Sequence, residues 1–133
     1  MRAYEFLTRP RMAKIRLQKA QAHVASLKSV AERATASFGL NSEPVSHTRD
    51  VTAMQSTIAK IVEEEQILNA KIDALVDAKR EIREVIDCIE DVTLRLILDK
   101  RHLLFQPWEE IAIDLGITSR WAKDRHREAL KAV

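Results

Sequence analysis

An apolar seam, with spacings of three and four residues, runs through the sequence between residues 51 and 89. The seam consists of Val51, Met54, Ile58, Ile61, Glu65, Leu68, Ile72, Leu75, Lys79, Ile82, Ile86 and Ile89. Ten of these twelve positions are apolar, a pattern typical of one long helix that buries a stripe of its surface. Such a helix is about 60 Å long. It needs a packing partner, because propensity alone does not stabilise it in water.

The partner is predicted to be an earlier helix, because a second seam with the same spacing precedes the first. Its positions are Ala13, Leu17, Ala20, Val24, Leu27, Ala31, Ala34 and Phe38. Thr8 suits an N-cap and Pro10 suits the first helical turn, so residues 1–8 are expected to form a short lead. Gly39 is expected to end this helix.

Residues 39–50 are predicted to form the loop that lets the two helices fold back as a long antiparallel, coiled-coil-like hairpin. Thr48 or Asp50 is expected to cap the second helix. Three valines beside the second seam widen its stripe: Val62, Val76 and Val85. Either the C-terminal segment or a second subunit is expected to cover this stripe, and we expect a homo-oligomer.

Two polar residues, Glu65 and Lys79, interrupt the second seam. Buried polar residues on a seam fix its register or the oligomeric state. Long charged side chains can also lie along a partly exposed seam with their charged ends in solvent. The sequence leaves both interpretations open.

Composition and charge favour an all-α fold with separate surfaces. Only two glycines and three prolines occur, which suits long helices. The net charge is +2, with nine basic against four acidic residues in 1–50, five against nine in 51–90, and eight against seven in 91–133. This distribution argues against a uniformly basic coat. A group of basic residues near the N-terminus is expected to be a solvated helix face rather than a second nucleic-acid surface: Arg9, Arg11, Lys14, Arg16 and Lys19.

Several classes of function have no support in the sequence. The single Cys88 allows neither an internal disulfide nor a cysteine-based zinc site. The histidines show no ligand spacing and no nucleophile has a plausible base, so we expect no metal, no cofactor and no catalysis. The histidines are His23, His47, His102 and His126. No apolar run approaches the length of a membrane span and the N-terminus lacks the apolar stretch of a signal peptide, so we expect the cytoplasm and no membrane partner.

The C-terminal part is predicted to contain three shorter helices. Residues 91–104 form the first, with Asp91 as its cap. Pro107 predicts the start of a helix over 108–115, and another helix is predicted over 119–132.

The last two helices have the spacing of a helix-turn-helix. Ala112 is small where the second helix must cross closely, and Gly116 permits the turn with positive φ. Ile117 is expected to fill the space between the helices, and Ser119 or Thr118 is expected to cap the second. That helix is expected to lie in the major groove of DNA.

The DNA-binding residues predicted from this spacing are Thr118, Ser119, Arg120, Lys123, Asp124, Arg127 and Lys131. Arg120 is the best candidate to read a base, because arginine can bind guanine in bidentate fashion. The basic residues after it, Lys123, Arg127 and Lys131, suit phosphates.

The segment 108–118, followed by Arg127, Glu128, Ala129 and Leu130, resembles region 4 of bacterial sigma factors. The whole chain is similar in layout to phage and prophage proteins that join a helical hairpin to such a helix-turn-helix, among them the ArpU- and RinA-type late-gene transcription regulators. The resemblance implies a transcription regulator that reads promoter or operator DNA in a bacterial host cell, with host RNA polymerase as a further partner. Residues 1–90 would then form an oligomerisation hairpin, and residues 91–133 the DNA-binding domain.

The chain departs from the sigma-factor pattern at Ala122 and Arg125, where large apolar side chains are expected. Trp121 is expected to pack inward in compensation, and Trp108 is likewise expected in the core. Two alternatives stay open: a phage assembly factor of the small-terminase type, and a protein-binding module that contacts RNA polymerase through a degenerate helix-turn-helix.

Overall fold

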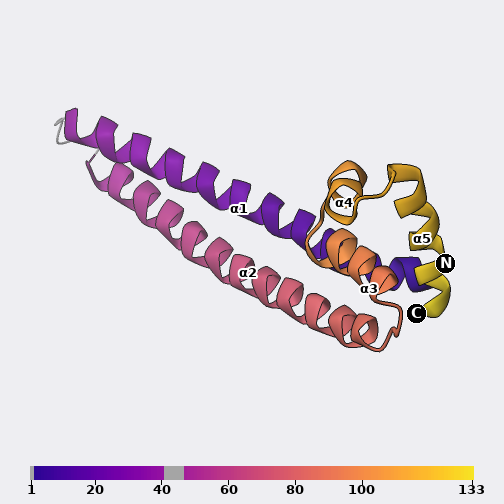
Figure 1. Cartoon of the computed structure of the whole chain (residues 1–133). Coiled ribbons are helices and arrows are strands. Elements are labelled where there is room, and N and C mark those ends of the chain that lie inside the picture. Colours follow the sequence, from indigo (N-terminus) through magenta and orange to yellow (C-terminus); the bar gives the residue numbers. More distant parts are fainter. Residues whose placement is uncertain (1, 41–46) are drawn as a thin grey trace. The chain divides into compact units, whose positions relative to one another are not determined.

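The computed structural model of the protein describes residues 2–40 and 47–133, with side chains over 2–34 and 51–133. Every regular element in these residues is helical, and the described parts contain no strand. The elements are α1 (Arg2–Leu40), α2 (His47–Asp87), α3 (Val92–Leu98), the π-helical segment η1 (Asp99–Leu103), α4 (Trp108–Leu115) and α5 (Ser119–Ala132), as Figure 1 shows. The predicted all-α class with two long leading helices is confirmed. No helix in the described residues is both long and apolar enough to cross a membrane.

The chain divides into two compact units. The first unit combines the residues up to Lys14 with Ala74–Val133, and the second unit is Ile15–Asp73. The start of α1 and the end of α2 therefore pack in the same unit as the C-terminal helices. The division predicted after residue 90 assigns oligomerisation to one part and DNA recognition to the other, and that assignment stays a prediction.

Polar contacts within the second unit join α1 to α2. His23 lies 3.7 Å from Glu64, and Lys28 lies 2.9 Å from Glu65, so the two helices lie side by side there, and Figure 1 shows them running in opposite directions. Glu65, one of the polar seam residues, thus has a partner on the opposite helix. Of the residues around the loop, 41–46 and the side chains of Thr48 and Asp50 lie outside the described residues. The backbone of α2 already begins at His47.

The seam of the second unit is only partly buried. Leu17 and Val24 of α1 are buried, whereas Ile58 and Ile72 of α2 are 49% and 39% exposed although they were predicted to face inward. A straight helix drifts by roughly 20° for each heptad relative to a strict seven-residue repeat. Seam positions therefore rotate out of the contact with a single partner helix.

The N-terminal segment was wrongly predicted to be a lead. The helix α1 begins at Arg2 and contains Pro10, and the Leu7 side chain is 0% exposed. The Pro10 ring is also fully buried, and this burial offsets the backbone hydrogen bond that proline cannot donate. Thr8 donates its hydroxyl to the Glu5 carbonyl (3.0 Å) inside the helix instead of capping it.

Two hydrophobic clusters form the core of the first unit. The larger cluster contains Leu7, Ile82, Ile86, Ile89, Leu94, Leu98, Leu103 and Ala129, from α1, α2, the loop after α2, α3, η1 and α5. The smaller one contains Ile97, Ile111 and Ala122, with Trp108, Leu115 and Ile117 packed against it. These clusters fix α5 against α3 and α4, which is what positions the candidate site.

The segment from Asp91 to the start of α4 combines a helix cap, a π-helical turn and a strained residue. The Asp91 carboxylate accepts hydrogen bonds from the backbone N–H groups of Thr93 (2.9 Å) and Leu94 (3.2 Å), as predicted for the cap of α3. Phe105 has a φ of 57°, a left-handed conformation that is costly for a residue with a side chain. Its ring lies 4.7 Å from the Lys14 ammonium and 5.0 Å from that of Lys79, so the second polar seam residue packs on an aromatic face.

Candidate nucleic-acid interface and the adjoining pocket

The turn between α4 and α5 has the conformation that the sequence predicts. Gly116 has φ 67° and ψ 34°, which is left-handed, and it ends α4. The Ile117 N–H donates to the Ala112 carbonyl at 3.0 Å, and Ala112 itself is buried. The small residue and the glycine thus lie where two closely packed helices need them.

Thr118, and not Ser119, is the N-cap of α5. Its hydroxyl accepts a hydrogen bond from the Trp121 backbone N–H at 3.1 Å, and its extended backbone (φ −79°, ψ 154°) turns the chain into the helix. The sequence left the two residues as alternatives. Ser119 is half-buried at the first helical position.

The remaining predicted DNA-binding residues all lie exposed on α5 or at its start: Thr118, Arg120, Lys123, Asp124, Arg127 and Lys131. From Arg120 onward, each lies three or four residues from another member of the set, which places them along one side of a helix. Asp124 lies 3.6 Å from the Arg127 guanidinium and partly offsets its charge. The structure therefore groups these residues on one solvent-facing surface, and their contact with DNA stays a prediction.

The two residues that depart from the sigma-factor pattern are accommodated in different ways. Ala122 is fully buried in the smaller cluster. The Arg125 guanidinium bridges Asp91 at 3.2 Å and Glu128 at 2.8 Å, so it ties α5 to the cap of α3. The prediction that Trp121 packs inward is wrong, because this side chain is 55% exposed. The inward positions of α5 start at Ala122, and the preceding residue points about 100° away around the helix.

A pair of buried histidines, which the sequence did not reveal, links η1 to α5. His102 and His126 are 4% and 6% exposed, and their Nε2 atoms lie 2.8 Å apart. Their rings are stacked, with centroids 5.1 Å apart, and Trp108 meets the His126 ring edge-on at 5.0 Å. The residues are 24 positions apart in the sequence. The only local signal was that His126 follows Ala122 by one turn on the inward side of α5.

Both histidines are neutral at neutral pH. Burial, followed by the charges of His126 and Arg101, lowers the pKa of His102 to about 3. Burial and then Arg101 lower the pKa of His126 to about 4. The Leu7 backbone partly opposes the lowering of the His102 pKa. Because both rings are neutral, one Nε2 of the pair donates its proton and the other accepts it.

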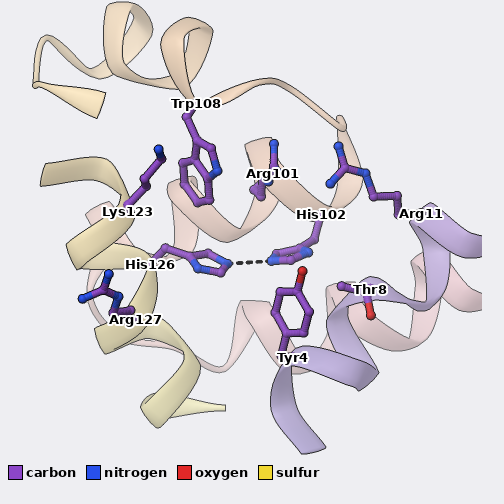
Figure 2. Close-up of a pocket in the computed structure, with 9 residues that line it drawn as sticks. All are labelled: Tyr4, Thr8, Arg11, Arg101, His102, Trp108, Lys123, His126 and Arg127. Atoms are coloured by element: carbon purple, nitrogen blue, oxygen red, sulfur yellow. Dashed lines mark hydrogen bonds between the residues drawn. The ribbon is translucent and has the colours of Figure 1, made fainter. Parts of the chain in front are cut away.

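A pocket of about 260 Å³ opens beside this pair, inside the first unit. Four of its lining residues are cations: Arg11, Arg101, Lys123 and Arg127. The others are Tyr4, Thr8, His102, Trp108 and His126, so no carboxylate lines it. Figure 2 shows Lys123 and Arg127 of α5 on one side and Arg101 with Arg11 on the other, with the histidine pair between them.

Arg101 is the most firmly held of these cations. Its guanidinium lies 4.6 Å from the centre of the Trp108 ring, and it donates a hydrogen bond to the Gln106 carbonyl at 3.0 Å. Burial, followed by the nearby charge of Arg11, lowers the pKa of Arg101. The pocket is therefore electropositive. In the described residues, no three side chains of His, Cys, Asp or Glu gather to form a metal-binding group.

Comparison of the chain with protein-family models, with curated proteins and with solved structures finds no match. The resemblance to sigma-factor region 4 therefore stays a prediction from the residues of segment 108–130.

Proposed function

We propose that this protein binds double-stranded DNA through α5 and acts as a phage- or prophage-type transcription regulator that reads promoter or operator DNA. The observation that carries the proposal is the geometry of α4 and α5. A left-handed Gly116 and a buried Ala112 join two short helices, and the second presents its cations outward. This is the arrangement in which a recognition helix enters the major groove.

The charge of α5 supports the proposal. Residues 118–133 hold five basic and two acidic side chains. One of these acids, Glu128, is paired with Arg125, which is half-buried, so the outward surface keeps four cations against Asp124. A positive helix surface of this kind suits the phosphates that flank a major groove.

The experiment that tests the proposal is selection of binding sites from a random duplex library with the full chain. Affinity for the selected duplex is then measured as a function of salt. We expect an enriched sequence, and an affinity that falls as salt rises, with a slope of about −0.9 for each phosphate contacted. No duplex binding at low salt would remove the proposal.

A second candidate function, contact with a protein such as RNA polymerase, is favoured by exposed apolar side chains on the same two helices. Ile113 of α4 is 80% exposed, and Trp121 of α5 is 55% exposed. Trp121→Gln distinguishes the two functions. Loss of polymerase retention with duplex affinity unchanged would support the second candidate, and polymerase retention that Trp121→Gln leaves unchanged would count against it.

A further inference from the structure

In the pocket of Figure 2, four cations surround a neutral floor that is formed by His102 and His126. We infer that the pocket binds a phosphate-class oxyanion, held between the arginines of α1 and η1 on one side and the cations of α5 on the other. Arg11 and Arg101 supply two planar guanidinium groups, each able to donate two parallel hydrogen bonds to an oxyanion. Lys123 and Arg127 supply the positive charges on the opposite side. The proposed DNA contacts of α5 involve neither Arg11 nor Arg101, so the pocket is a larger site than that surface.

The charges that line the pocket are not balanced within the protein. In the part of the chain that the structure describes, neither Arg11 nor Lys123 forms an ion pair, and Arg101 donates to a carbonyl rather than to a carboxylate. Arg127 is 3.6 Å from Asp124, at the long end of the range for an ion pair. Like charges in one partly desolvated pocket repel each other, and a bound anion removes that repulsion.

One of the binding groups, Arg101, is already in place before any ligand arrives. The Trp108 ring and the Gln106 carbonyl hold Arg101, which leaves its other N–H groups to donate. The hydrogen bond between His102 and His126 is satisfied internally, so the floor is neutral and adds no carboxylate that would repel an anion. Preorganised donors cost little ordering entropy on binding.

The number of charges and the volume select the class of ligand. A carboxylate has two oxygens and one charge, which leaves most of the four cations without a partner. A phosphate group has up to two charges and several acceptor oxygens, and arginine forks match its geometry in bidentate fashion. The volume of about 260 Å³ far exceeds the roughly 10–15 Å³ that one water needs. A phosphate with part of an attached group therefore fits.

The same chemistry has two sources, a free phosphate compound and a phosphate of a DNA backbone. Lys123 and Arg127 belong both to this pocket and to the predicted DNA-binding surface, whereas Arg11 and Arg101 belong to the pocket alone. A substitution of Arg11 therefore changes the pocket without altering the α5 surface.

The test is a titration of the full chain with inorganic phosphate, with chloride holding the ionic strength constant. The imidazole proton signals of His102 and His126 are followed by NMR, and the affinity is measured by calorimetry. Saturable binding is expected. Arg11→Gln should weaken it about tenfold, as the loss of one charge-assisted hydrogen bond does.

Arg9→Gln is the matched control. It removes a cation two residues away on the same helix, where Arg9 faces Glu81 at 3.7 Å and not the pocket. Its phosphate affinity should stay within about twofold of the parent. Equal weakening by Arg9→Gln, or imidazole signals that respond to phosphate no more than to chloride, would overturn the inference. If Arg11→Gln fails to fold, Lys123→Gln against Lys131→Gln makes the same comparison on α5.

A random-sequence duplex added to the phosphate-loaded protein identifies the source. Displacement of the phosphate identifies the DNA backbone, and retention identifies a free phosphate compound. Arg11-dependent phosphate binding without any duplex binding would remove the proposed function and leave this site intact.

Discussion

Polar side chains, and not apolar packing alone, hold α5 in place. Asp91 uses one carboxylate oxygen to cap α3 and the other to bind Arg125 of α5. This ion pair is partly exposed, so it contributes at most ~1 kcal/mol. The histidine pair is buried, and it depends on both rings remaining neutral. The stability of the first unit is therefore sensitive to pH.

The first prediction concerns that pH dependence. The pKa of His102 and of His126 is lower in the folded protein than the ordinary 6.5, so below pH 6.5 the unfolded chain binds protons that the folded chain does not. Stability is thus complete above pH 6.5 and falls as the pH drops toward about 4. The expected loss is about 1.4 kcal/mol for each pH unit and each histidine. Urea unfolding at pH 7.5, 6.5 and 5.5 measures it.

The double variant His102→Gln/His126→Gln should have nearly the same stability at pH 7.5 and 5.5, although it is less stable at neutral pH. His23→Gln, which changes an exposed histidine of the second unit, should keep the slope of the parent. A parent protein whose unfolding free energy does not decrease between pH 6.5 and 5.5 would contradict the neutral, buried pair.

The second prediction separates base reading from phosphate binding on α5. Arg120→Ala should cost about 1–3 kcal/mol on a selected duplex and little on a scrambled one, because it removes a base contact. Lys131→Ala should weaken both duplexes about equally and reduce the salt slope by about one unit, because it removes a phosphate contact. Fluorescence anisotropy over a series of salt concentrations measures both. Equal weakening of the two duplexes by Arg120→Ala would show that this residue does not read a base.

At the scale of elements, local signals predicted the ends of the C-terminal helices. Pro107 and Gly116 set the ends of α4, and Asp91 caps α3, because each acts through its own backbone or its nearest neighbours. The start of α1 was predicted wrongly for the opposite reason. Proline is typical of the first turn of a helix, so Pro10 predicted a start near residue 8. The burial of Leu7 instead extends the helix to Arg2.

Local patterns in the sequence could not predict the candidate pocket. Its cations come from α1, η1 and α5, and its floor joins histidines of two different elements. No periodicity or motif spacing connects such residues, because only tertiary packing brings them together. The basic group near the N-terminus was interpreted as a solvated face, and the structure places one of its members, Arg11, in this pocket.

The third prediction tests the turn that joins α4 and α5. A Cβ added at Gly116 would meet no atom within 4 Å, so the cost of substitution comes from the backbone alone. Gly116→Ala should destabilise the protein by about 1–2 kcal/mol, the cost of a left-handed alanine. Gly116→Asn should cost less, because asparagine tolerates this conformation. Thermal unfolding measures both, and equal losses would mean that something other than φ governs this position.

At the scale of the whole molecule, the long helix α2 has exposed apolar side chains. Their exposure to solvent does not stabilise an isolated chain. Val62 and Val76, expected to widen the seam, are exposed, so no described part of the same chain covers them. Ile58 and Ile72 are exposed as well, at positions one helical turn from these valines. The prediction that a second subunit covers this stripe remains, and paired subunits also suit DNA with two half-sites.

The last prediction is therefore that the protein self-associates through α2. Multi-angle light scattering at micromolar concentrations should give at least twice the mass of one 15.2 kDa chain. Val62→Lys with Ile72→Lys should shift the protein toward the monomer, because two charges on the stripe must be desolvated for the subunits to associate. Val30→Lys, an exposed apolar residue of α1, is the control and should leave the mass unchanged. A parent protein that stays monomeric at high micromolar concentration would show that the stripe does not form a subunit interface, and each α5 would then read a single half-site.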